Sequence, residues 1–154
     1  MNRDPIRAIT DDEIAAYATD GVVLLRQMFD ADWVAYLRDA VEADLASPGA
    51  LHNDITRGGS GSFRSDTFVW ANTPAFRKFL TDSPAPQLTA AVMGTDKVNL
   101  LFDQILSKEP ATSTETVWHH DATYWPVLGD QISTLWLALD PVTAGGGAVE
   151  FVKG

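Results

Sequence analysis

Hydrophobic side chains in the first third of the chain recur at the three- and four-residue spacing of amphipathic helices. Thr10 followed by Glu13 predicts a capping box at the start of a short helix, and Gly21 predicts its end. The apolar run 22–25 predicts an extended segment, and Asp30 predicts the N-cap of a longer helix. The stripe of this second helix consists of Trp33, Val34, Leu37, Val41 and Leu45. We expect that stripe to lie in the protein core.

Two further helix starts combine an N-cap residue with a proline at the first helical position. They are Thr73 and Ser83, each followed directly by proline, and Gly94 predicts the end of the second of these helices. Residues 1–95 are therefore expected to be mainly helical.

A glycine-rich sequence, RGGSGSFRS at 57–65, predicts a mobile loop between these helices. The order of its glycines matches neither a phosphate-binding loop nor a dinucleotide-binding loop. Its two arginines, Arg57 and Arg64, either attract a carboxylate or phosphate of a substrate or are only solvated.

The pattern changes to that of strands after residue 95, with turns that contain Pro, Gly and Asp. The expected strands are 98–108, 116–121, 132–139 and 148–152. Since no helical segment separates them, antiparallel pairing is favoured. The sequence therefore predicts an α+β fold with helices packed on an antiparallel sheet or barrel, in a single domain over residues 1–154.

Composition and charge restrict the possible functions. The chain has 154 residues, 45% of them hydrophobic, and a net charge of −10, which disfavours nucleic acid as a partner. It has no apolar run long enough for a membrane span and no signal-like start, so no membrane partner and a cytoplasmic location are expected. It has no cysteine, so a metal would have to be bound by histidine and carboxylate side chains.

The segment from Trp118 to Pro126, WHHDATYWP, carries the clearest chemistry. In a strand, residues two apart point to the same face with Cα atoms roughly 6.5–7 Å apart, so His119 and Asp121 can converge on one ion. One imidazole and one carboxylate make up two of the three ligands of the facial triad that holds Fe(II) and leaves positions open. The alternative is that both histidines are hydrogen-bonded near a turn that the aspartate caps.

Two of the expected strands place polar residues where a pocket wall would need them. Alternation in 98–108 puts Gln104 and Lys108 on an otherwise apolar face, where the lysine either meets an anion or extends into solvent at the strand end. Alternation in 132–139 puts leucines on one face and Thr134 and Trp136 on the other. The leucine face is suited to packing against helices, and the other face either lines a pocket or belongs to the core.

The ordered set LSKEP, WHHDATYWP, ISTLWLALD and AVEFVKG resembles the phytanoyl-CoA dioxygenase family of Fe(II)- and 2-oxoglutarate-dependent oxygenases. The resemblance covers roughly residues 98–154. It implies a double-stranded β-helix of the jelly-roll or cupin type, with N-terminal helices packed on it. It also implies a dioxygenase that uses oxygen and 2-oxoglutarate to hydroxylate a small organic substrate.

The resemblance also assigns residues. His119 and Asp121 would bind Fe(II), Lys108 and Trp136 would contact 2-oxoglutarate, and Gln104 is a further candidate for that contact. Because related halogenases have a small residue at the position of Asp121, the aspartate favours hydroxylation. The substrate would lie near Tyr124, Trp125 and the 57–65 loop with Arg64.

The family also supplies a third ligand, a histidine, and an arginine for 2-oxoglutarate, both after the Gly-rich turn. In this chain no histidine follows His120 and no arginine follows Arg77. His52 lies in the helical half and is not expected to replace the missing ligand. We therefore expect a chain that lacks the C-terminal part of the domain.

Two other interpretations remain. The chain could act as an incomplete cupin-like binding or dimerising module, with an unpaired strand edge at 148–152, forming a homo-oligomer. Alternatively, it could be a cupin-like protein with another metal or none.

Overall fold

The two longer helices begin and end where the sequence predicts. In a computed structural model, which describes residues 1–58 and 60–154, α1 spans Asp11–Asp20 and α2 spans Ala31–Ala46. The Thr10 hydroxyl accepts the Glu13 amide at 3.2 Å, and the Glu13 carboxylate accepts the Thr10 amide at 3.0 Å. Gly21 ends α1 with φ 72°, a left-handed conformation that glycine adopts without strain. The capping box and the Asp30 N-cap are thus confirmed.

Three short helices follow, α3 (Val69–Asn72), α4 (Pro74–Asp82) and α5 (Ala85–Val92). The last two were predicted, whereas α3 was not. Thr73 is the N-cap residue of α4, as predicted, although its side chain makes no cap bond. The N-cap of α5 is Pro84 rather than the predicted Ser83, whose hydroxyl accepts the Ala85 amide at 3.1 Å. Among the described residues, no helix is both long and apolar enough to cross a membrane.

The sheet has three antiparallel strands in the order β1–β2–β3, with β1 at Asn53–Asp54, β2 at Phe63–Thr67 and β3 at Gln104–Lys108. Phe63 pairs with Lys108 and Thr67 with Gln104, so β2 and β3 align over their whole length. The prediction of a loop over 57–65 was therefore wrong at its end, because Phe63 and its neighbours pair with β3, a strand much further along the chain.

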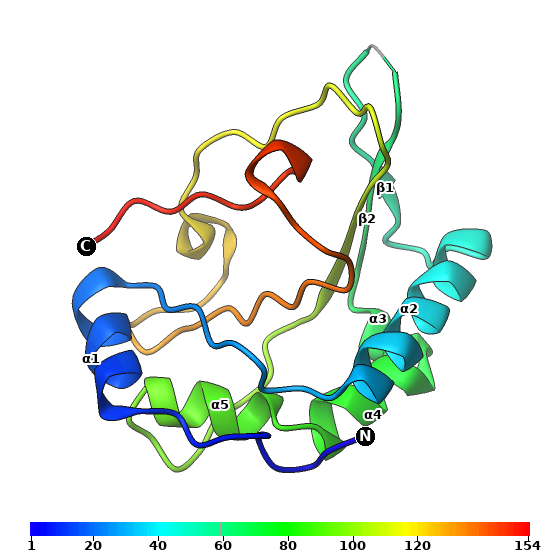
Figure 1. The fold of residues 1–154 in the computed structure, drawn as a ribbon. Coiled ribbons are helices and arrows are strands. Elements are labelled where there is room, and N and C mark those ends of the chain that lie inside the picture. Colours follow the sequence, from blue (N-terminus) through cyan, green and yellow to red (C-terminus); the bar gives the residue numbers. More distant parts are fainter. Residues whose placement is uncertain (59) are drawn as a thin grey trace.

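Most of the second-half strands were also predicted wrongly. Only Gln104–Lys108 of the segment 98–108 is a strand, and 116–121, 132–139 and 148–152 form no ladder among the described residues. A strand forms only where a neighbour satisfies its backbone N–H and C=O groups, and alternation alone does not supply that neighbour. In Figure 1 this part of the chain, coloured yellow to red, crosses between the sheet and α1 as coil with two short 3-10 turns, η1 (Asp121–Tyr124) and η2 (Ala144–Gly146). The result is a mixed α+β structure with a small antiparallel sheet.

The core lies between the helices and one face of the sheet. Its buried cluster consists of Leu37, Ala40, Val69, Phe76 and Ile105. Because Ile105 points into this cluster, its neighbours Gln104, Leu106 and Lys108 share the opposite, more exposed face of β3. Leu137 and Leu139 pack against the same cluster, as the leucine alternation predicts.

A buried acidic group lies between α2 and the sheet. Asp66 is 2% exposed, and its carboxylate accepts the backbone amides of Gly49 and Thr67 at 2.7 and 2.8 Å. Asp44 is 8% exposed, and its Oδ2 has no hydrogen-bond partner among the described residues. Burial, and then the negative charge of Asp66, raises the pKa of Asp44 above its ordinary value.

Replacing Asp44 with Asn should stabilise the protein at neutral pH. A carboxyl whose pKa is raised by folding contributes stability below its ordinary pKa of about 3.9, and that contribution is lost as the pH rises through the raised value. We expect the free energy of unfolding of D44N to exceed that of the wild type by about 1 kcal/mol at pH 7. The gain should shrink as the pH falls. Urea denaturation at pH 7 and at mildly acidic pH measures both quantities.

Asp39 provides the matched control, since it lies on the exposed side of the same helix. D39N should change stability little at either pH. A D44N protein less stable than the wild type at pH 7 would mean that the carboxylate has a cationic partner, for which the neighbouring His52 is the candidate.

Candidate metal centre

His119 and Asp121 converge although the expected strand around them is absent. Asp121 begins a 3-10 turn, Asp121–Tyr124, and His120 before it is extended with φ −118° and ψ 119°. One extended residue between two side chains places both on the same side, as in a strand. His119 Nε2 lies 3.0 Å from Asp121 Oδ1. The predicted pair is therefore present, on the end of a coil and the start of a turn.

The contact of the other ring nitrogen of His119 indicates how the short distance between Nε2 and the Asp121 carboxylate is to be interpreted. Nδ1 lies 2.8 Å from the Val117 carbonyl oxygen, which can only accept, so the proton of a neutral imidazole is on Nδ1. Nε2 then presents a lone pair to the carboxylate. Two lone-pair donors at 3.0 Å repel each other unless a proton or a metal cation lies between them. The geometry is thus that of an imidazolium–carboxylate ion pair or of two ligands to one metal ion.

The spacing fits adjacent positions on a metal ion. Two ligands about 2.1 Å from a metal, at a right angle to each other, lie about 3.0 Å apart. The His119 and Asp121 side chains are 36% and 46% exposed, which leaves room for further ligands. In the described part of the chain, no group of three or more His, Cys, Asp or Glu residues is arranged to hold a metal. The residues present therefore fit two positions of such a site.

Two other residues contact the pair. The Thr134 hydroxyl lies 3.2 Å from Asp121 Oδ2, and the Tyr124 ring meets the His119 ring edge to face with 6.0 Å between the centroids. Sequence reasoning placed Thr134 on the pocket side without linking it to Asp121, and it missed the Val117 carbonyl. Alternation pointed to the threonine, whereas nothing in a sequence signals one particular backbone carbonyl.

The residues expected to contact 2-oxoglutarate lie on two separate segments. Lys108 ends β3 with Nζ 5.0 Å from the centre of the Phe63 ring, and it has no carboxylate partner among the described residues. Gln104 is exposed on the same face of β3, and Trp136 is 47% exposed. No hydrogen bond or ion pair between described residues joins these three to the His119–Asp121 pair. Their roles stay predictions.

The expected substrate residues are also separated. Tyr124 is next to the pair, and Trp125 packs edge to face on Phe102 with centroids 5.9 Å apart. Arg64 lies on β2, on the face opposite Lys108, with its guanidinium 3.2 Å from the Glu109 carboxylate. Its role in substrate binding stays a prediction.

His52 lies in the loop before β1, and among the described residues it forms no three-ligand group with the pair. It lies close enough to Asp44 and Asp54 to interact electrostatically with both. Its Nδ1 is buried without a partner among the described residues.

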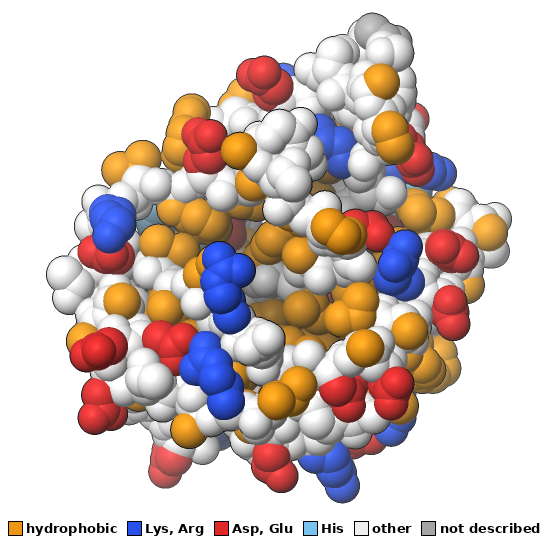
Figure 2. Space-filling model, in the orientation of Figure 1, with side chains coloured by type: hydrophobic (Ala, Val, Ile, Leu, Met, Phe, Trp, Pro, Cys, Tyr) orange, Lys and Arg blue, Asp and Glu red, His pale blue; other side chains and the backbone are white. Residues whose placement is uncertain are grey.

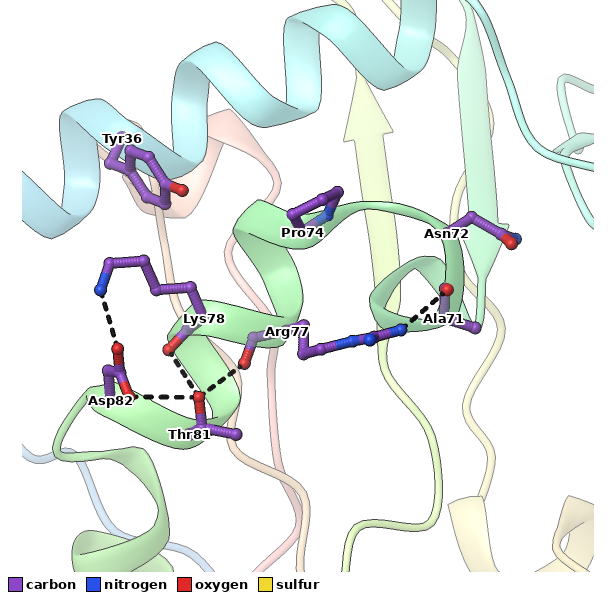
Figure 3. A pocket seen from close by; sticks show the side chains of 8 residues that line it. All are labelled: Tyr36, Ala71, Asn72, Pro74, Arg77, Lys78, Thr81 and Asp82. Carbon is purple, nitrogen blue, oxygen red and sulfur yellow. Dashed lines mark hydrogen bonds and ion pairs between the residues drawn. The ribbon is translucent and has the colours of Figure 1, made fainter.

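A pocket of about 460 Å³, shown in Figure 3, is lined by residues of α2, α3 and α4. It contains two cations, but both are already engaged. Lys78 Nζ is 2.8 Å from Asp82, and Arg77 donates to the Trp70 and Ala71 carbonyls. Because none of the predicted site residues lines this pocket, it does not extend the candidate site.

Comparison with known proteins gives one family and a small set of relatives. Residues 17–154 match the family model described as phytanoyl-CoA dioxygenase (PhyH). The ectoine dioxygenase of Sphingopyxis alaskensis is 30% identical over 117 residues, covering 75% of this chain and 38% of that protein. The ectoine dioxygenase of Bordetella bronchiseptica is 26% identical over 122 residues, covering 78% of this chain and 39% of that protein. The chain thus spans about two fifths of the length of these relatives. No solved structure gives a significant match.

Proposed function

This chain belongs to the phytanoyl-CoA dioxygenase family, and on that premise we propose that it carries part of the active site of an Fe(II)- and 2-oxoglutarate-dependent dioxygenase. The reaction proposed is hydroxylation of a small organic substrate. The observation that carries the proposal is the convergence of His119 Nε2 and Asp121 Oδ1 at 3.0 Å, with Nδ1 on the far side of the ring 2.8 Å from the Val117 carbonyl oxygen. This is the arrangement that two adjacent metal ligands need.

The chemistry divides between the metal and the protein. Fe(II), when bound together with 2-oxoglutarate and oxygen, supplies the oxidising power that hydroxylates an unactivated C–H bond. His119 and Asp121 would hold the ion from one side and leave its other side open. Tyr124 would help to hold the orientation of the imidazole through the edge-to-face contact of the two rings.

Lys108 is the residue best suited to hold a carboxylate of 2-oxoglutarate. Its ammonium lies over Phe63 on a face of β3 that also carries the apolar Leu106, so an anion there would meet a cation in partly apolar surroundings. Charge attraction is stronger in such surroundings than in bulk water. Trp136 would supply an indole wall, and Gln104 a further donor.

The three observed strands would form part of a double-stranded β-helix in the whole protein. The face of β3 with Gln104 and Lys108 would then line the inside of that barrel. A third histidine ligand and an arginine for 2-oxoglutarate, which the family supplies, are not among residues 122–154. The names of the relatives make ectoine the first substrate to assay.

Turnover of 2-oxoglutarate by the whole protein tests the proposal, since this chain supplies two of the ligands. We expect succinate formation that depends on Fe(II) in the wild-type whole protein and falls to background in H119A and D121A, because each substitution removes one ligand. His120 offers a matched control, since it is exposed and adjacent to the pair but outside it. H120A should retain turnover. Turnover that survives H119A would contradict the assignment of the ligand, and a wild-type whole protein without turnover would contradict the proposed activity.

A second candidate function is a dimerising module, favoured by the exposed apolar face. β3 is the last strand of the sheet, and its outer edge has no strand partner in the part of the chain that the structure describes. Figure 2 shows hydrophobic side chains gathered around a hollow on this side of the molecule. Large exposed hydrophobic residues from β3 and the C-terminal half include Leu106, Trp118, Trp136, Phe151 and Val152. An unpaired edge with apolar surface beside it favours pairing with another chain.

Sedimentation or light scattering distinguishes this candidate. If a second copy covers the face, the wild type should be a dimer at micromolar concentration, and L106K should be a monomer because a charge would be buried in the interface. Leu51 is similarly exposed but lies beyond the C-terminus of α2, so L51K should stay dimeric. A folded, monodisperse wild-type monomer would contradict the dimer.

A further inference from the structure

The two carboxylate oxygens of Asp121 have different surroundings, and this difference points to a role for Thr134. Oδ1 faces His119 Nε2 at 3.0 Å, whereas Oδ2 lies 3.2 Å from the Thr134 hydroxyl. The atoms of the pair that face away from each other are thus both held, Nδ1 of His119 by the Val117 carbonyl and Oδ2 of Asp121 by Thr134. The lone pair on Nε2 and a lone pair on Oδ1 converge between the two side chains.

We propose that Thr134 is a positioning residue that keeps Asp121 a one-oxygen metal ligand, an inference that rests on the proposed function. A carboxylate can bind a metal through one oxygen or through both, and in the second case it occupies an additional position on the ion. A hydroxyl that donates to Oδ2 competes with the metal for that oxygen. Thr134 therefore keeps open a position that oxygen or 2-oxoglutarate needs.

The hydroxyl is placed by the helical core rather than by the site itself. Leu137 and Leu139 pack against the buried cluster, and Leu135 is half-buried on the same side of the segment. Since side chains alternate along this extended segment, Thr134 faces the opposite way, towards Asp121. Insertion of the leucines thus determines the direction of the hydroxyl.

Both ends of the segment are tied to helices. The Tyr17 hydroxyl of α1 donates to the Ser133 hydroxyl at 2.9 Å, and Arg38 of α2 pairs with Asp140 at 3.0 Å. Ser133 is the direct neighbour of Thr134, so the first of these bonds restricts the backbone beside the hydroxyl. A group held in this way can orient a ligand because its own position is fixed before the metal binds.

Metal titration of the chain and three variants tests the role. Mn²⁺ is the probe, since it takes the same nitrogen and oxygen ligands and broadens the NMR signals of nearby amides. Broadening at residues 119–121 reports on the site itself. T134V keeps the shape of the side chain and removes the hydroxyl, T134S keeps the hydroxyl, and T123V removes a nearby hydroxyl that bonds to the His120 carbonyl at 2.8 Å.

We expect Mn²⁺ bound to T134V to hold one water fewer than Mn²⁺ bound to the wild type, because Asp121 can then bind through both oxygens. Water-proton relaxation measures this number. T134S and T123V should hold as many waters as the wild type does. All four proteins should unfold at the same temperature, since the hydroxyl is on an exposed residue.

The outcomes separate this inference from the proposed function. If the wild type shows no broadening at residues 119–121, the metal pair is wrong, and the role of Thr134 is wrong with it. If Mn²⁺ bound to T134V holds as many waters as Mn²⁺ bound to the wild type, the metal pair stands and the role of Thr134 alone is overturned. A lost water in T134V that is also lost in T134S would overturn it as well.

Discussion

Ile105 enters the helical core from the middle of β3, and much of the remaining arrangement depends on that insertion. Burial of this side chain against Leu37 and Phe76 fixes which face of the strand points to the helices. Gln104 and Lys108 must then lie on the other face, because neighbours in a strand alternate. Leu137 and Leu139 act in the same way in the 132–139 segment and turn Thr134 outward. One hydrophobic core thus orients two polar surfaces that are far apart in the sequence.

The helices were predictable because their signals are local. The Thr10–Glu13 capping box, the Asp30 N-cap and Gly21 each act within one helical turn, so the residues that decide the boundary are adjacent in the sequence. Short α3 carries no such signal, as its N-cap is Phe68 with φ 59° and no side-chain bond. It was missed for that reason.

The strands were predicted less well because pairing is not local. Alternation correctly predicts that Leu137 faces the core and Trp136 faces away from it, although their segment forms no ladder. Burial depends on the side chains of the segment itself, whereas a ladder needs a neighbouring strand. Phe63 shows the opposite case, a strand residue without a strand signal in the sequence. It lies in a glycine-rich stretch that predicts a loop, and yet it pairs with Lys108 in the sheet. Alternation therefore predicts which way a side chain faces better than it predicts whether a strand is present.

The same distinction separates the parts of the candidate site. His119 and Asp121 come together through one extended residue, so their convergence is a property of three consecutive positions and was predictable even though the surrounding strand is absent. The bonds to Oδ2 and the placement of Lys108 depend on the core, through segments that meet only in the folded chain. A ligand pair built locally can persist while the surrounding sheet is small. Three properties of the site must instead come from the non-local contacts: its selectivity, the number of open positions on the metal and the binding of a cosubstrate. Through these contacts the helical core influences the chemistry of the site.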